Sequence, residues 1–185
     1  YAAIPLAFSY IIRPTNSISI ALFTILMLAR YRKFFIKYCF WGVLIAVPFI
    51  LHNIFIYHSI LPPYYLSGRI GLGNYFLEAL LGNLFSPARG LFIFSPILIF
   101  SIYGVFKQIK KKQLNKLDYT ILFIIIFHWL TISSFPHWWG GDSFGPRFFT
   151  DMMPFFVYFL MGVIVGILLK ERIKKKFYSE MVKER

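Results

Sequence analysis

Four long apolar runs dominate this sequence and limit the folds that are open to it. They cover residues 36–57, 89–106, 117–136 and 148–169. A helix needs about 20 apolar residues to cross the hydrocarbon core of a bilayer, and each run is close to that length. Backbone polar groups inside a bilayer must be hydrogen-bonded within the protein, which a helix achieves in one segment. The sequence therefore predicts an all-α fold, a polytopic bundle of transmembrane helices.

Composition supports a membrane protein. Hydrophobic residues make up 58% of the chain and charged residues 15%, whereas soluble domains are about 45–50% apolar and about 25% charged. The formal net charge of +13 would indicate a nucleic-acid partner in a soluble protein. Here the lysines cluster at the ends of apolar runs, as the positive-inside rule describes. We therefore expect a lipid bilayer as partner and no nucleic acid.

Two shorter apolar runs precede the long ones, at residues 1–12 and 17–29, and Arg13-Pro14-Thr15-Asn16 separates them. Proline interrupts a helix and biases the preceding residue toward extended geometry. We predict two short helices, with one kinked helix as the alternative. The chain begins at Tyr1 and lacks the features of a signal peptide. We expect it to be the C-terminal part of a longer protein.

Basic residues form three clusters, which all fall on one side of the membrane if each run crosses once. They are Arg30, Arg32, Lys33 and Lys37; then Lys107, Lys110, Lys111, Lys112 and Lys116; then Lys170, Arg172, Lys174, Lys175, Lys176, Lys183 and Arg185. The positive-inside rule makes that side cytoplasmic. Residues 1–170 are then the transmembrane bundle, and residues 171–185 are a basic cytoplasmic tail.

The opposite side carries arginine but no lysine. Its cations are Arg13, Arg69, Arg89 and Arg147. The guanidinium group is a planar fork that binds phosphate through two hydrogen bonds, whereas the lysine ammonium is a point charge. These arginines are candidate ligands of a phosphate group. The alternative is that membrane orientation alone removes lysine from this side.

The segment from residue 59 to residue 88 is too long for a simple connector. We predict a long extracytoplasmic loop that contains a short interfacial helix within residues 74–85, where apolar positions alternate with Asn74, Glu78 and Asn83. This helix either anchors and seals the bundle or forms one wall of a lipid-facing cleft.

A second connector, residues 137–151, gathers polar and aromatic groups between two apolar runs. Charges held near a bilayer are costly and usually serve binding or catalysis. We predict that His137, Trp138 and Trp139 contact a substrate. The alternatives are the aromatic belt at the membrane edge for the tryptophans and a plain hydrogen bond for the histidine.

The same connector supplies the acids Asp142 and Asp151, which are the candidate catalytic residues. The carboxylate of an acidic residue can act as a base and take the proton from an attacking hydroxyl group. For Asp142 the alternative is an ion pair with Arg147 that orders the connector. For Asp151 the alternative is an acid at a helix N-terminus, where the helix dipole favours negative charge.

Three stretches resemble segments of a known superfamily. They are Arg13-Pro14-Thr15, then Ser86-Pro87-Ala88-Arg89-Gly90-Leu91-Phe92 followed by Ser95-Pro96, and Trp138-Trp139-Gly140-Gly141-Asp142-Ser143-Phe144-Gly145-Pro146-Arg147-Phe148. These stretches are similar to bacterial membrane glycosyltransferases of the GT-C type, relatives of the dolichyl-phosphate-mannose protein mannosyltransferases and of the lipid A aminoarabinose transferase. The resemblance implies a polyprenyl-phosphate sugar donor and chemistry at the extracytoplasmic face. It also implies a catalytic Asp in an early outer loop, which this sequence lacks.

We therefore expect part of a membrane glycosyltransferase in the bacterial inner (plasma) membrane, with its site facing outward. A flippase or transporter for a lipid-linked sugar, or a non-catalytic membrane subunit, is the alternative. None of the acids falls at the centre of a predicted span, which favours the enzyme over a proton-coupled transporter. The residues indicate no metal motif or particular cofactor and leave a divalent cation open. The sugar, the acceptor and the oligomeric state are not determined by the sequence.

Overall fold

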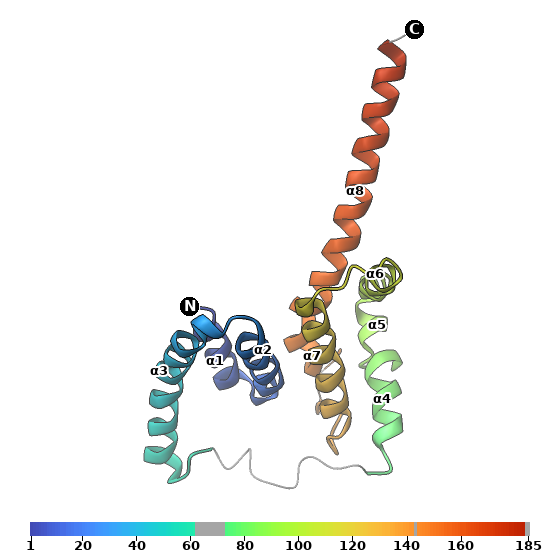
Figure 1. Cartoon of the computed structure of the whole chain (residues 1–185). Helices are drawn as coiled ribbons and strands as arrows, with labels where there is room; N and C mark the ends of the chain where they lie inside the picture. The colour runs from blue at the N-terminus through green and yellow to red at the C-terminus, as the bar shows by residue number, and fades with distance from the viewer. Residues whose placement is uncertain (62–72, 143, 184–185) are drawn as a thin grey trace.

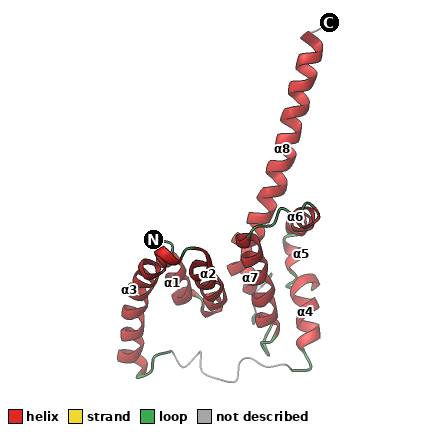
Figure 2. Cartoon of the chain, viewed as in Figure 1, coloured by secondary structure: helices red, strands yellow, loops and turns green. Residues whose placement is uncertain are grey.

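A computed structural model describes residues 1–61, 73–142 and 144–183 of the chain. Within these residues the secondary structure is helical and contains no strand (Figure 2). Three helices are long and apolar enough to cross a membrane: Arg32–Tyr57, Lys116–Ser133 and Arg147–Leu168. The prediction of an all-α fold is confirmed for the described residues, and these three helices make the chain a candidate membrane protein.

The N-terminal part contains α1 (Ala3–Ile12), the 3-10 turn η1 (Pro14–Asn16), α2 (Ser17–Arg30) and α3 (Arg32–Tyr57). Arg13 is extended, with φ −148° and ψ 116°, so α1 and α2 are two helices and not one kinked helix. Pro14 accounts for this break, because a proline ring clashes with a helical residue before it. Helix α1 packs against α3, and α2 packs against a later helix, α7 (Lys116–Ser133). Figure 1 shows α2 as the N-terminal helix nearest to α7.

Large apolar side chains along α3 are exposed on the protein surface. Ile36 is 82% exposed and Phe55 is 85% exposed, and only 6% of the most apolar window of this helix is buried. Soluble monomers rarely expose a continuous apolar patch of that kind, because its hydration is unfavourable. A lipid environment removes this cost, and the surface of α3 is therefore suited to contact with lipid.

The expected continuous span over residues 89–106 is wrong. The chain instead forms α4 (Phe76–Phe85), α5 (Leu91–Phe94), the 3-10 turn η3 (Pro96–Leu98) and α6 (Ile99–Lys110). Ser95 is not helical, with φ −135° and ψ 65°, because Pro96 disfavours the helical region for the residue before it. Helix α6 has 12 residues, and at about 1.5 Å per residue it is shorter than a bilayer core of about 30 Å.

The helix predicted within residues 74–85 is present as α4. Residues 62–72 of the predicted long loop lie outside the described residues, and so does Arg69.

The C-terminal part contains α7 (Lys116–Ser133), the 3-10 turn η4 (Arg147–Met152) and α8 (Met153–Lys183). A reciprocal cap starts α7: Asn115 Oδ1 accepts a hydrogen bond from the Asp118 backbone at 3.0 Å, and Asp118 Oδ2 accepts one from the Asn115 backbone at 2.7 Å. Helix α7 ends at Ser133, earlier than residue 136, where the predicted span ended.

A buried core packs around η4 and holds it between α5, α7 and α8. Its buried members are Leu91, Phe92, Leu98, Ile132, Phe149, Met152 and Phe156.

In Figure 1, α3 and α7 both begin toward the end of the molecule where α6 lies and both finish toward the opposite end. The described basic clusters at the starts of these two helices therefore lie toward one end, and the connector that follows α7 begins at the other.

Candidate functional site

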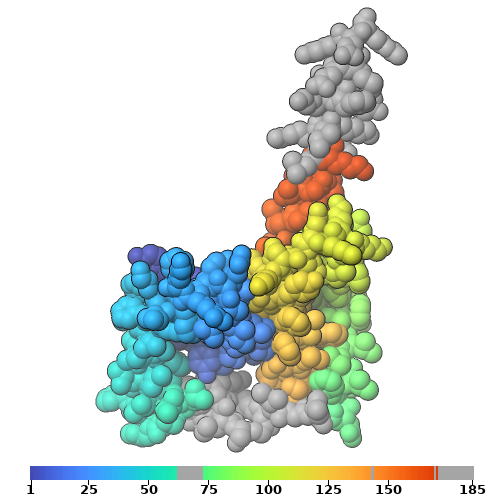
Figure 3. Space-filling view, in the orientation of Figure 1, coloured from blue at the N-terminus to red at the C-terminus, as the bar shows by residue number. Residues whose placement is uncertain are grey.

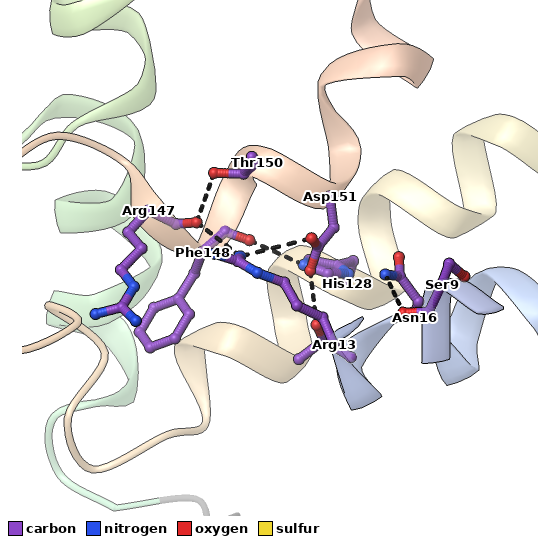
Figure 4. A network of polar contacts seen from close by, with 9 residues as sticks. Ser9, Arg13, Asn16, His128, Arg147, Phe148, Thr150 and Asp151 are labelled. Carbon is purple, nitrogen blue, oxygen red and sulfur yellow. Dashed lines mark hydrogen bonds and ion pairs between the residues drawn. The ribbon is translucent and has the colours of Figure 1, made fainter. Parts of the chain in front are cut away.

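An ion pair joins the break between α1 and α2 to the turn before α8. Arg13 Nη1 lies 3.5 Å from Asp151 Oδ1, and Thr15 Oγ1 donates a hydrogen bond to Asp151 Oδ2 at 2.7 Å. The side chain of Asp151 is 8% exposed and that of Arg13 is 29% exposed. A carboxylate this well buried needs a cation and hydrogen-bond donors nearby. Figure 4 shows both groups meeting between the elements that carry them.

Arg13 also fixes the backbone at the start of η4. Its Nη1 donates to the carbonyl oxygen of Arg147 at 2.9 Å, and Thr150 Oγ1 donates to the same oxygen at 2.8 Å. The side chain of Arg147 is exposed. In Figure 4 it extends away from Asp151, on the side of the green ribbon. Within the described residues, neither a hydrogen bond nor an ion pair engages its guanidinium group. The backbone of Arg147 is thus held while its charge remains free.

Arg89 lies on a tight turn between α4 and α5. The Gly90 backbone donates to the Ser86 carbonyl at 2.7 Å, and a Cβ at Gly90 would lie 2.5 Å from Ser86 N, so the turn requires glycine. Arg89 Nη1 is buried and has no hydrogen-bond partner among the described residues. A buried donor without a partner is unfavourable, and such a group in a native structure often marks a bound ion or water.

A backbone hydrogen bond links the turn of Arg89 to the connector that carries Arg147. The Gly145 N–H donates to the Ala88 carbonyl at 3.1 Å. Gly145 has φ +76°, a conformation that other residues rarely adopt. Arg89 and Arg147 therefore each lie within two residues of the same hydrogen bond, which brings the two segments together.

His128 lies in α7 beneath this network and is fully buried, with 1% exposure. Its Nε2 donates to the Phe148 carbonyl at 3.1 Å, since a carbonyl oxygen only accepts. Its Nδ1 has no partner within the described part of the chain. His128 thus positions η4 from the α7 side, as Arg13 does from the α1–α2 side.

The aromatic residues of the connector separate into two roles. Trp138 is buried and packs against α4, where a Cβ at Gly82 would lie 2.4 Å from its ring. Trp139 is 39% exposed, and the His137 ring meets it edge-on with centroids 5.1 Å apart. Trp138 therefore fastens the connector to α4, while Trp139 and His137 remain available to a ligand.

The two candidate acids differ in their surroundings. Asp142 is exposed, next to Gly141 with φ +75°. Among described residues the structure contains one ion pair, that of Arg13 with Asp151, and it contains none between Asp142 and Arg147. Both oxygens of Asp151 already have a partner. Of the two, only Asp142 has a carboxylate that is open to a substrate.

The structure thus brings Arg13, Asp151 and the Arg147 backbone together directly, and a backbone hydrogen bond joins the Arg89 turn to the connector that carries Arg147. Sequence reasoning missed Thr15 and His128 as parts of this site. Thr15 stands in the Arg-Pro-Thr stretch that carried the resemblance, whereas no local pattern marked the contact of His128 with the Phe148 carbonyl. No cluster of metal-binding side chains occurs among residues 1–61, 73–142 and 144–183.

Comparison with known proteins identifies no family: no family model matches the sequence, and neither a curated protein nor a solved structure matches it.

Proposed function

We propose that this chain forms part of an integral membrane glycosyltransferase that transfers a sugar from a polyprenyl-phosphate donor to an acceptor. The observation that carries this proposal is the pair of uncommitted guanidinium groups. Arg89 has a buried nitrogen without a partner among the described residues. Arg147 lies shortly after Gly145, whose N–H donates to the carbonyl of Ala88 in the Arg89 turn. Two arginines in this arrangement suit a phosphate, which accepts paired hydrogen bonds from such forks.

In this proposal Arg89 and Arg147 hold the donor phosphate. As the glycosidic C–O bond breaks, its electron pair stays on the phosphate oxygen, and the two guanidinium groups stabilise the charge that builds there. Arg13 does not share this role, because Asp151 already balances its charge. Arg13 is a positioning residue that holds the Arg147 backbone in place.

The acceptor hydroxyl attacks the anomeric carbon, and its proton passes to a carboxylate that acts as general base. Asp142 is the candidate within this chain, because its carboxylate is exposed on the connector. Asp151 remains the charge partner of Arg13. The exposed ring of Trp139 and the neighbouring His137 suit the face and the hydroxyl groups of a sugar.

The proposed protein spans the bacterial inner membrane several times, with this site facing outward. Two basic clusters lie toward the end of the helices opposite to the connector that follows α7 (Figure 1), and the positive-inside rule assigns the basic end to the cytoplasm. Helix α4 runs beside α7 (Figure 1), and its exposed Leu77 and Leu81 are suited to lipid contact.

The test is equilibrium binding of a polyprenyl phosphate to the full chain in phosphatidylcholine nanodiscs. We expect Arg147→Lys to weaken binding at least tenfold, because lysine retains the charge but loses the fork. Arg32→Lys is the matched control, since Arg32 is exposed near the opposite end and, among the described residues, donates only to the Leu28 carbonyl. Equal affinity of the Arg147→Lys variant and the native chain would contradict the proposal.

A second candidate function is transport of a lipid-linked sugar, and His128 is the observation that favours it. An ionisable side chain buried within a candidate span, with a free Nδ1, is typical of proton-coupled carriers. Reconstituted liposomes separate the two functions: a carrier moves the labelled lipid between leaflets when a proton gradient is applied. A transferase releases polyprenyl phosphate and forms a glycosylated acceptor without a gradient.

A further inference from the structure

Helices α6 and α8 cross in direct contact. Ser101 Oγ donates to the Phe156 carbonyl at 2.8 Å in a buried hydrogen bond. A Cβ at Gly104 would lie 2.8 Å from the Phe159 carbonyl oxygen and 2.8 Å from Val163 Cγ2. The backbones therefore meet at a point where only glycine fits. Figure 3 shows the atoms of α6 (yellow) against those of α8 (orange).

A cavity of about 400 Å³ lies beside this crossing. The second half of α6, the linker to α7, the start of α7 and α8 line it. On α8, Gly162 and Gly166 line the cavity beside Tyr158 and Val163. Glycine has no side chain, so these two positions leave room for a ligand. Gln108 Nε2 lies 3.3 Å from the Cβ position of Gly162, and Lys107 Nζ lies 3.8 Å from that of Gly166. The volume is within the range of small-ligand pockets, about 300–1,000 Å³.

Among the described residues, the charged groups that line the cavity are two lysines and one acid. Lys107 and Lys111 contribute the cations, and Asp118 contributes the carboxylate. Asp118 is 3% exposed. Its Oδ1 accepts from the Tyr158 hydroxyl at 2.7 Å and its Oδ2 from the Asn115 backbone at 2.7 Å. Because hydrogen bonds from the protein already engage both carboxylate oxygens, the charge offered to a ligand is that of the lysines.

We propose that this cavity is an anion site that binds a phosphate group, carried by the headgroup of an anionic phospholipid or by a soluble phosphate ester. Lysine ammonium groups beside amide donors such as that of Gln108 suit a phosphate as point charges and donors. Basic pockets between helices at the lysine-rich membrane side are the usual place for anionic headgroups. The site lies on α6, away from the turn of Arg89, and is independent of the glycosyltransferase proposal.

The test measures lipid binding to the full chain by native mass spectrometry, which counts the lipids that stay bound. The chain is released from detergent micelles that contain either dioctanoylphosphatidylglycerol, which is anionic, or dioctanoylphosphatidylcholine, which is zwitterionic. The cavity variant is Lys107→Ala with Lys111→Ala. Its control is Lys110→Ala with Lys116→Ala, which removes the same charge from residues that do not line the cavity. A third variant, Gly162→Leu, fills the cavity without changing any charge.

We expect the anionic lipid to bind the native chain at least tenfold more tightly than the zwitterionic lipid. The cavity variant and Gly162→Leu each lose at least tenfold in affinity, and the control stays within twofold. Release of the lipid by millimolar inorganic phosphate identifies a soluble phosphate ester as the ligand, and retention of the lipid identifies a headgroup. Equal weakening in the control, or unchanged binding in both cavity variants, overturns the proposal.

Discussion

At the scale of residues, the arginines differ in what already holds them. Arg13 is paired with Asp151, whereas the guanidinium group of Arg147 and one nitrogen of Arg89 have no partner among the described residues. The sequence marked all of them as candidate phosphate ligands because of their side of the membrane and their chemistry. It did not separate the paired arginine from the free ones, because Arg13 and Asp151 are far apart in the chain. Only the packing of η4 against the α1–α2 break brings them together.

Breaking the Arg13–Asp151 pair is expected to destabilise the protein. Asp151→Asn leaves Arg13 with an uncompensated charge, which costs about 3–5 kcal/mol in a fully buried pair. Because Arg13 is 29% exposed, we expect a smaller loss, about 1–2 kcal/mol. Thermal unfolding in detergent measures it. Asp142→Asn is the control, since this exposed acid has no ion pair among described residues. An equal change in both variants would show that the pair contributes nothing.

At the scale of elements, the apolar pattern predicted which segments are helical but not where one of them breaks. The run at residues 89–106 has the composition of a single span. The structure instead has two helices, α5 and α6, with the 3-10 turn η3 between them. The close contact of α6 with α8, which depends on Gly104 and Ser101, favours this break. Such a contact between distant segments has no signature in the local sequence.

Gly104 tests this contact directly. Gly104→Leu places a side chain where Phe159 and Val163 already lie 2.8 Å from a Cβ, so α6 must move away from α8. Overpacking of this kind costs about 1–3 kcal/mol, and thermal unfolding will show a lower midpoint. Gly162→Leu is the matched control, because among the described residues its Cβ would meet only the flexible end of Gln108 at 3.3 Å. A midpoint for Gly104→Leu equal to that of the control would contradict the described crossing.

At the scale of the whole molecule, the two proposed anion sites lie in separate parts of the fold. Arginines from the α4–α5 turn and η4 form one site, where Arg13 of the α1–α2 break holds the Arg147 backbone, and lysines of α6 and its linker form the other. The uneven distribution of arginine and lysine was visible in the sequence. The sequence did not show that three distant segments supply the first site, or that a helix crossing creates the second.

The most direct test of the central claim is to map where a polyprenyl phosphate binds. A photoactivatable analogue, with its reactive group beside the phosphate, is added to the full chain in nanodiscs and crosslinked peptides are identified by mass spectrometry. The account predicts crosslinks to residues 86–90 and 145–151, and their loss in an Arg89→Ala, Arg147→Ala variant. Crosslinks confined to residues 107–118, or crosslinks at the arginine segments that persist in this variant, would contradict it.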